Sequence, residues 1–391
     1  MTNAIVVAIL AGLTIFVAPS LIRNQSALPS PSGPYAIGTL AASIERTART
    51  GAYPIEVWYP AQATSDRAPY STGRHGLIDA VIGRLLLTRA SRNAPPLAGT
   101  TRFPIVFYLA GWNGLRFENT ALCENLASHG FAVIALDDVT HETPSLPALA
   151  GPLDLSSDSA YASTLVRAAR KLRYSSNRVS DILDRLLTSG SPVPADLARR
   201  LDETRIAAMG YSFGGAIAYD VARTDARFRA AINLDGWLFT DHHRVTTGRH
   251  VPYLLIGGSE EIVPLHTHSV SPDPLIRNTT ILDDGDWSLQ RRLLERGGAS
   301  VQVSGATHSS FADNVPHAII RRKLATIDPD RLARIVSRYS LAFLDRELDI
   351  DGRRMTDLSA THDSEVRYVS WPVADIVQRG HRSPKGRNVG T

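Results

Sequence analysis

The stretch Met-Gly-Tyr-Ser-Phe-Gly-Gly, residues 209–215, determines the fold that the sequence predicts. An apolar run of strand length, residues 206–209, precedes it, and residues 216–219 are typical of the first turn of a helix. Gly-x-Ser-x-Gly between a strand and a helix is the nucleophile elbow, a strained turn that pushes the serine hydroxyl out of the sheet. The stretch therefore predicts Ser212 as a nucleophile.

The neighbours of this serine support the interpretation. A Cβ atom at Gly210 or Gly214 would collide with the adjacent strand or helix, so both glycines have a steric reason. The backbone N–H of Phe213 is expected at a helix N-terminus, where the dipole favours negative charge on a substrate carbonyl oxygen. One loop would then supply the nucleophile and one oxyanion donor.

Apolar runs of strand length recur on both sides of the turn, over residues 104–109, 131–136, 229–234 and 252–256, and residues 300–303 alternate as a last strand. A helix predicted over residues 119–129 separates the first two, which indicates a parallel pair with a right-handed crossover. Residues 55–60 alternate and predict an earlier antiparallel strand. We therefore expect an α/β-hydrolase fold, with a mostly parallel, doubly wound sheet.

Three more segments are predicted to be helical. Residues 77–87 predict a helix within a surface excursion, and residues 141–202 have a helical period and are expected to cover the site as a cap. An amphipathic helix should begin after Asp328, which is a favourable N-cap. These segments would flank the sheet and its functional edge.

Length, charge and composition limit the classes of function that are open to this chain. The chain has 391 residues, a length that suits one large α/β domain, and a net charge of +4. Its basic clusters are not interleaved with aromatic residues, so we expect no nucleic-acid partner. The clusters over residues 167–173 and 321–323 are expected to be solvated helix faces, and contact of the first with an anionic membrane surface is the alternative. Cys123 is the only cysteine, which excludes an intramolecular disulfide, and the sequence predicts no particular oligomeric state.

The two ends of the chain differ from its middle. Residues 1–18 are mostly apolar and predict a signal peptide or a membrane anchor, followed by a Pro/Ser-rich linker over residues 19–34. The catalytic domain is expected over residues 35–350, exported and either secreted or anchored outside the cytoplasm. Residues 351–391 predict a basic, partly disordered C-terminal extension.

A serine nucleophile needs an imidazole to take its proton and a carboxylate to orient that imidazole. His308 follows the last predicted strand, in the chain order Ser, acid, His of the α/β-hydrolase fold. Two acids compete, because Asp235 and Glu261 each follow a predicted strand. We favour Asp235, since a short side chain at a strand end, followed by glycine and the bulky Trp237, suits a buried carboxylate.

An acidic cluster elsewhere invites a different interpretation. Asp137, Asp138 and His141 follow the strand predicted over residues 131–136, as the ligands of a metal site could. No further ligand has a helpful spacing, so we expect no metal.

Three segments together resemble the platelet-activating factor acetylhydrolases of the secreted plasma type. Residues 210–215 are similar to that family's Gly-His-Ser-Phe-Gly-Gly, with Tyr211 in place of the histidine. Residues 234–239, Leu-Asp-Gly-Trp-Leu-Phe, resemble its Leu-Asp-Ala-Trp-Met-Phe, and residues 308–313, His-Ser-Ser-Phe-Ala-Asp, resemble its His-Gln-Asn-Phe-Ala-Asp. The resemblance runs from about Val57 to Leu348.

The resemblance implies a role for each matching residue. Ser212 would be the nucleophile, Asp235 the orienting acid and His308 the base. Phe213 and Trp112 would supply the oxyanion N–H groups, although Ala-Gly-Trp-Asn-Gly stands here where the family has a His-Gly-Leu-Gly type of turn. Neither a metal nor an organic cofactor is implied.

The sequence therefore predicts a cofactor-independent serine carboxylic ester hydrolase. Its expected substrates are short or oxidised acyl esters of glycerophospholipids, or similar small esters. Two alternatives stay open: a dienelactone-type or polyester hydrolase of the same fold, and a non-catalytic binding protein that keeps the fold but not the reaction.

Overall fold

The computed structural model describes residues 28–45, 52–71, 87–141, 149–188, 191–240, 242–258, 270–313, 326–350 and 363–369. The predicted export segment, most of the linker, nearly all of the helix predicted over residues 77–87 and the candidate acid Glu261 lie outside these residues. No helix within the described ranges is long and apolar enough to cross a membrane.

The core of the protein is one twisted sheet, which has eleven strands within the described residues. The strands are β1 (Ala36–Glu45), β2 (Ala52–Ala61), β3 (Arg67–Pro69), β4 (Leu87–Arg92), β5 (Phe103–Leu109), β6 (Ala132–Leu136), β7 (Leu201–Tyr211), β8 (Phe228–Leu234), β9 (Tyr253–Gly258), β10 (Ala299–Val303) and β11 (Val366–Val369). They lie in the order β11-β10-β9-β8-β7-β5-β6-β2-β1-β4-β3. The six strands from β10 to β6 are mutually parallel, whereas β2 and β11 pair antiparallel at either end of this block.

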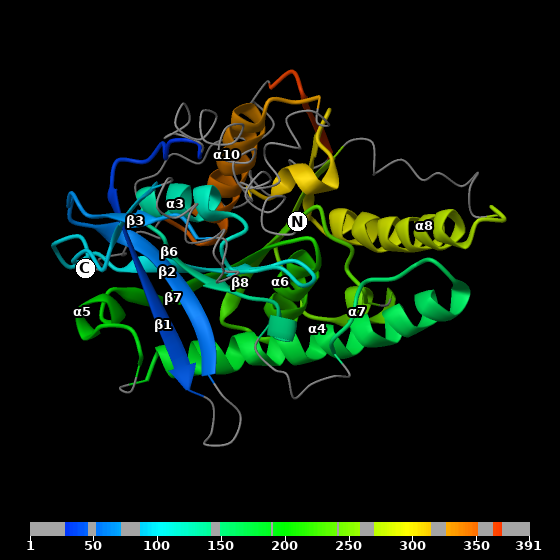
Figure 1. Cartoon of the computed structure of the whole chain (residues 1–391), viewed down its shortest axis with the longest axis horizontal. Helices are drawn as coiled ribbons and strands as arrows, with labels where there is room; N and C mark the ends of the chain where they lie inside the picture. Colours follow the sequence, from blue (N-terminus) through cyan, green and yellow to red (C-terminus); the bar gives the residue numbers. More distant parts are fainter. Residues whose placement is uncertain are drawn as a thin grey trace, which may run out of the picture.

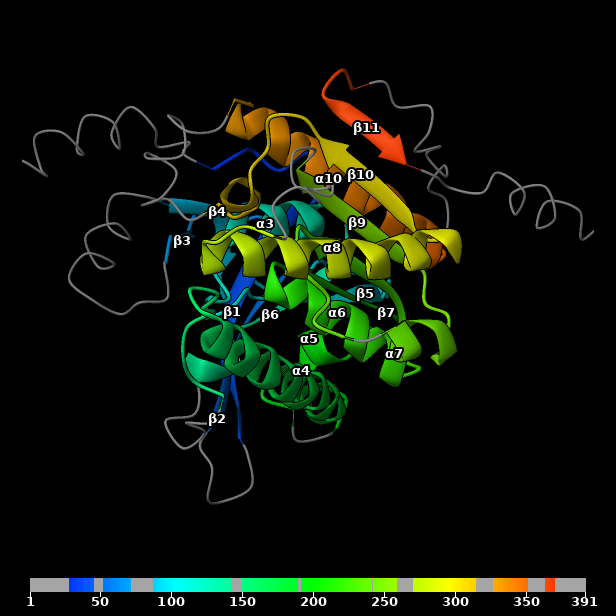
Figure 2. The same cartoon turned by 90° about the vertical axis from the view of Figure 1, so that its right-hand side faces the viewer.

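Helices cover both faces of the sheet (Figures 1 and 2). The helices are α3 (Thr120–Ser128), α4 (Asp158–Leu186), α5 (Ala195–Ala198), α6 (Phe213–Thr224), α7 (His242–Thr247), α8 (Pro274–Glu295) and α10 (Pro329–Glu347), with the short 3₁₀ turns η1 (Val139–His141) and η2 (His308–Phe311). Side chains of α3 and α10 pack into one apolar cluster, and those of α4, α6 and α8 into the cluster on the opposite face. The doubly wound, mostly parallel sheet predicted from the sequence is confirmed.

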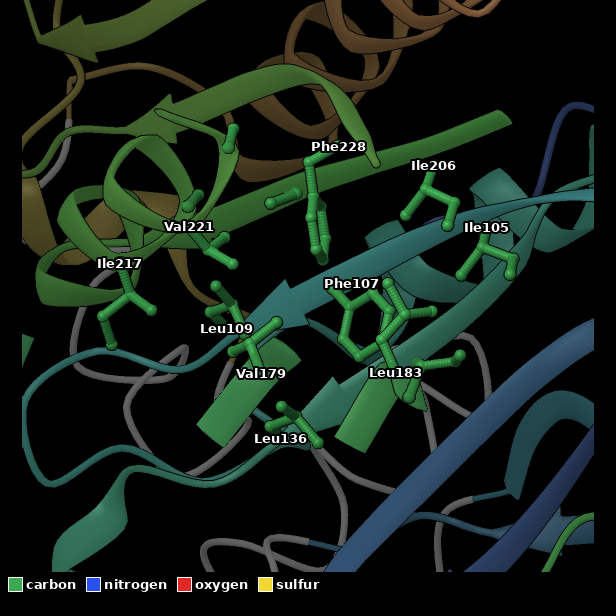
Figure 3. Close-up of a cluster of buried hydrophobic side chains, with 14 of the residues drawn as sticks. Ile105, Phe107, Leu109, Leu136, Val179, Leu183, Ile206, Ile217, Val221 and Phe228 are labelled. Carbon is green, nitrogen blue, oxygen red and sulfur yellow. The ribbon is translucent and has the colours of Figure 1, made fainter. Parts of the chain in front are cut away.

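The central strands are buried on both faces, which explains why their sequences are continuous apolar runs. Every residue of β5 and of β6 is buried, because helices cover both faces of a parallel sheet. Figure 3 shows how Phe107 of β5, Phe228 of β8 and Leu183 of α4 meet on one face. The two phenylalanine rings lie 5.6 Å apart. Each such side chain contributes about 1.5 to 3 kcal/mol of hydrophobic stabilisation.

The segment that was predicted to cap the site instead forms a long helix that packs against one face of the sheet. The segment predicted over residues 141–202 contains α4, whose buried apolar residues, Leu172 and Ile182 among them, belong to the apolar cluster on one face of the sheet. The helical period was correct, but a period identifies an apolar face without specifying what that face packs against. Near the functional edge, Tyr161 and Leu165 of the N-terminal half of α4 line a pocket, and Arg178 of its C-terminal half donates a hydrogen bond to the backbone oxygen of Asp137.

Described residues on both sides of the predicted catalytic domain, 35–350, also contact the sheet or its helices. Within the predicted C-terminal extension, β11 adds a strand to the sheet beside β10, and Arg331 of α10 forms ion pairs with Asp363 and Glu365. At the other end, Ser32 and Gly33 of the predicted linker donate backbone hydrogen bonds to side chains of α3. Hydrogen bonds and ion pairs attach both segments to the rest of the protein. A hydrophobic pattern does not show such contacts, so it could not indicate that these segments pack against the catalytic domain.

Candidate active site

Ser212 lies at the tip of a sharp turn between β7 and α6. Its φ of +55° falls in the left-handed region that non-glycine residues rarely adopt. A Cβ added to Gly210 would lie 2.2 Å from the backbone of Gly214, and one added to Gly214 would lie 1.9 Å from the carbonyl oxygen of Leu109. The steric need for both glycines, predicted from the sequence, is confirmed.

The structure brings the three predicted triad residues together at the carboxyl edge of the parallel strands. His308 Nε2 lies 3.0 Å from Ser212 Oγ, and His308 Nδ1 lies 2.8 Å from Asp235 Oδ2. The residues follow three different strands, β7, β8 and β10. This geometry lets the imidazole accept the serine proton while the carboxylate fixes the imidazole tautomer.

Asp235 is held rigidly for this contact. Its φ is +56°, and its Oδ1 accepts a hydrogen bond of 2.9 Å from the N–H of Gly258. The carboxylate is 5% exposed, while the ring of His308 is 45% exposed and reachable from solvent. The competing acid, Glu261, lies outside the described residues.

Tyr211 contacts the histidine from the elbow. Its ring stacks on the ring of His308 with 5.0 Å between centroids and 28° between planes. Its hydroxyl donates a hydrogen bond of 3.1 Å to the backbone oxygen of His308. Sequence reasoning identified Tyr211 only as a departure from the family pattern, and the structure shows that the substituted residue supports the imidazole.

The Trp112 loop, residues 110–114, passes directly beside the nucleophile. A Cβ added to Gly111 would lie 3.2 Å from the Cβ of Ser212. The ring of Trp112 packs edge-on against the ring of Phe213, with centroids 4.9 Å apart. Among the described residues, none accepts a hydrogen bond from the backbone N–H of Trp112. Both residues predicted to supply oxyanion N–H groups therefore flank Ser212.

The carboxyl group of Glu118 is buried and holds the Trp112 loop through a hydrogen bond. Glu118 Oε1 accepts hydrogen bonds from the N–H of Gly111, at 2.7 Å, and from the hydroxyl of Tyr108, at 3.3 Å. Burial raises the pKa of Glu118 to about 8. Sequence reasoning missed this residue, and the only signal was an acidic side chain shortly after a glycine-containing turn.

The acidic cluster after β6 is neutralised by cations of the chain itself. Asp137 forms an ion pair with Arg116, and Asp138 forms one with Lys171. His141 bonds a backbone carbonyl of the Trp112 loop instead of facing the two carboxylates. Within the described part of the chain, no group of three or more histidine, cysteine or acidic residues is arranged to hold a metal.

A pocket of about 440 Å³ lies between α4 and α8, next to this edge of the sheet. Its walls are mostly apolar, and the exposed Arg173 and Arg244 also line it. Phe239 joins the pocket to the catalytic edge, because its ring packs 5.5 Å from the ring of Phe213 and 6.2 Å from that of Trp112. The side chain of Phe239 therefore lies between the pocket and the two aromatic residues that flank Ser212.

Comparisons with known proteins give a consistent result. Residues 180–364 match the family described as platelet-activating factor acetylhydrolase, isoform II. A platelet-activating factor acetylhydrolase of Cavia porcellus is 25% identical over 375 residues, which cover 84% of this chain and 79% of that protein. Its counterpart in Bos taurus is 24% identical over 369 residues, with coverages of 84% and 78%.

Other esterases share the fold. Cutinase 1 of Thermobifida cellulosilytica is 28% identical over 244 residues, which cover 62% of this chain and 68% of the cutinase. The solved structure of a ferulic acid esterase from Streptomyces cinnamoneus superposes with a TM-score of 0.64 at 25% identity, and the match covers 87% of this chain and 98% of the esterase. These likenesses confirm the α/β-hydrolase fold and place the chain among the carboxylic ester hydrolases.

The family match includes the three strand ends that carry Ser212, Asp235 and His308. The full-length relatives extend it over most of the chain. The resemblance that the motifs indicated is confirmed: the chain is similar to the platelet-activating factor acetylhydrolases over most of its length.

Proposed function

We propose that this protein hydrolyses carboxylic esters through a covalent acyl-enzyme on Ser212. The observation that carries the proposal is the continuous chain of contacts from Asp235 through His308 to Ser212, at 2.8 and 3.0 Å. Its members come from three separate strand ends, so local sequence does not explain their meeting. A nucleophile, a base and an orienting acid within hydrogen-bonding reach are the parts that acyl transfer requires.

The reaction follows from these positions. Ser212 Oγ attacks the ester carbonyl carbon while its proton passes to His308 Nε2, and the carbonyl oxygen becomes an oxyanion. Collapse of this intermediate breaks the bond to the alcohol, which leaves with the proton from His308. Water then attacks the acyl-enzyme by the same route, releasing the carboxylic acid and restoring Ser212. Asp235 keeps the Nδ1 proton of His308 in place during both halves.

The oxyanion is proposed to accept hydrogen bonds from the backbone N–H groups of Phe213 and Trp112. Phe213 begins α6, where the first N–H groups have no intrahelical acceptor and the helix dipole is positive. Trp112 approaches from the loop that follows β5, the parallel strand next to β7. Two preorganised donors of this kind stabilise the charge without reorganising solvent.

The substrate is proposed to be an amphiphilic ester with a short or oxidised acyl group, as in a glycerophospholipid. The pocket between α4 and α8 supports this, since its apolar walls suit a hydrocarbon portion and Arg173 and Arg244 suit a phosphate or carboxylate. The exposed apolar side chains Leu275 and Ile276 of α8 lie at the N-terminal end of the same helix. They favour contact with a lipid surface, which an exported enzyme would meet.

A polyester hydrolase is the second candidate, and the likeness to a cutinase favours it. A panel of esters separates the two readings. Acetyl and oxidised-acyl glycerophospholipids should be turned over with higher kcat/KM than neutral aliphatic polyester oligomers, and the reverse order would support the second candidate. A fluorophosphonate probe should label wild-type protein at Ser212, while a failure to label folded protein would favour a non-catalytic binding protein.

A further inference from the structure

One fully buried ion pair lies behind the Trp112 loop. Lys171 of α4 and Asp138, which follows β6, form a salt bridge with both side chains 0% exposed. Lys171 is one of only three lysines in a chain whose other basic residues are arginine. Burying two charges costs free energy that their attraction need not repay, so such a pair is weak evidence of a stabilising role. Its contacts indicate another role.

Asp138 fixes the backbone of the Trp112 loop. The oxygen that bonds Lys171 also accepts a hydrogen bond from the N–H of Asn113, the residue directly after Trp112. The N–H of Asp138 in turn donates to the carbonyl oxygen of Gly114, at 3.1 Å. Asn113 has a φ of +56°, a strained conformation that persists only where surrounding contacts impose it. The Asp138 carboxylate is one such contact.

Lys171 contacts the two residues proposed to bind the oxyanion. Its Nζ lies 4.2 Å from the ring centroid of Trp112 and 5.4 Å from that of Phe213. Both distances allow a cation–π attraction, which is stronger where water is excluded. The ammonium group therefore lies beside the ring pair and contacts the aromatic side chains of both donors, and its partner Asp138 holds the adjacent backbone.

We propose that the Lys171–Asp138 pair is a positioning device for the oxyanion hole. Asp138 sets the peptide orientation of the Trp112 loop, and Lys171 fixes the rings of Trp112 and Phe213 against each other. The pair acts through these residues and does not touch substrate. The inference rests on the proposed function, because it assumes that the two N–H groups receive the oxyanion.

Replacing both charged residues by apolar ones distinguishes a role of the pair in positioning the oxyanion hole from a role in stabilising the fold. In the Lys171→Met, Asp138→Leu double variant neither charge is left unpaired, and such replacements of buried pairs are often neutral or stabilising. If the pair only stabilises the fold, the folded double variant should have the kcat of the wild type. A positioning pair predicts a folded double variant that reacts slowly, because the N–H of Asn113 has lost its acceptor.

We expect kcat to fall by about 10- to 100-fold, since losing an oxyanion donor outright costs about 10²- to 10³-fold. KM should change by less than about threefold, because the ground-state ester gains little from these donors. A trifluoromethyl ketone, which forms an anionic hemiketal with the serine, should lose affinity by the same factor as kcat. Wild-type kcat, or a loss confined to KM, in the folded double variant would overturn the proposal.

The matched control is Arg223→Met, Asp220→Leu, which removes another largely buried pair, from the C-terminal half of α6. Its kcat should stay within about twofold of wild type. The isosteric Asp138→Asn variant is the second test and should lower kcat with KM unchanged; failure of both Asp138 variants to fold would make the pair a requirement of the fold and contradict us. Fluorophosphonate labelling of Ser212 in each variant distinguishes a misplaced oxyanion hole from the absence of a serine nucleophile.

Discussion

Asp235→Asn tests the assignment of the acid, and its outcome follows from the two contacts of the carboxylate. Oδ1 accepts the N–H of Gly258 at 2.9 Å and Oδ2 faces Nδ1 of His308 at 2.8 Å. An asparagine satisfies Gly258 only through its single carbonyl oxygen, which turns its NH₂ group toward Nδ1. His308 must then carry its proton on Nε2, where it cannot accept the proton of Ser212.

We therefore expect kcat to fall by on the order of 10³- to 10⁴-fold, or about 4 to 5.5 kcal/mol in activation free energy. KM should change little, because the acid does not contact substrate. The assay is steady-state hydrolysis of a p-nitrophenyl acetate type of ester, with circular dichroism to confirm folding. Substitution of one carboxylate oxygen by NH₂ barely changes volume, so the fold should persist.

The matched control for the acid is Glu261→Gln, which we expect to lower kcat by less than about tenfold. A larger loss in Glu261→Gln than in Asp235→Asn would transfer the acid role to Glu261. It would also mean that the contact between Asp235 and His308 does not operate during catalysis.

Three further changes have defined outcomes. Gly214→Ala should destabilise the fold by at least about 3 kcal/mol, because the new Cβ would lie 1.9 Å from the carbonyl oxygen of Leu109; a chemical denaturation curve like that of wild type would contradict the packing of the elbow. Deleting residues 1–27 should leave kcat and KM unchanged, whereas deletion through residue 34 should lower Tm by removing the Ser32 and Gly33 hydrogen bonds to α3. Burial raises the pKa of Asp286 to about 7, so the folded protein keeps a proton on this carboxyl that the unfolded chain releases near pH 4. The free energy of unfolding of the wild type should therefore fall between pH 4 and 7, by at most about 4 kcal/mol, relative to that of Asp286→Asn. Tm values of the two proteins that change in parallel with pH would contradict the pKa shift.

Local patterns predicted the parts of the site that depend on local chemistry. The elbow could be found because Gly210 and Gly214 are required by sterics that act within a few residues. His308 and Asp235 could be placed because each follows a predicted strand, and parallel strands end at one edge of a sheet. The position of α10 was predicted for a similar reason, since Asp328 caps its first turn by accepting from the N–H of Arg331.

What the sequence did not reveal depends on contacts between distant segments. Glu118 and Lys171 look like ordinary charged residues of solvated segments, and only the fold buries them behind the Trp112 loop. The antiparallel strand β1 was not predicted, and neither was the attachment of residues 363–369 to β10. Hydrogen bonds and ion pairs across the chain carry no periodicity, so hydrophobic patterns could not show them.

The central claim, that Ser212 is the acylated nucleophile, is tested most directly by kcat of Ser212→Ala with a short-acyl ester. The hydroxyl contributes no core packing, so the variant should fold as wild type does. The account predicts a loss on the order of 10⁴-fold or more, with the remaining rate due to the oxyanion hole and binding alone. Turnover within about tenfold of wild type by the folded Ser212→Ala protein would contradict the acyl-enzyme mechanism.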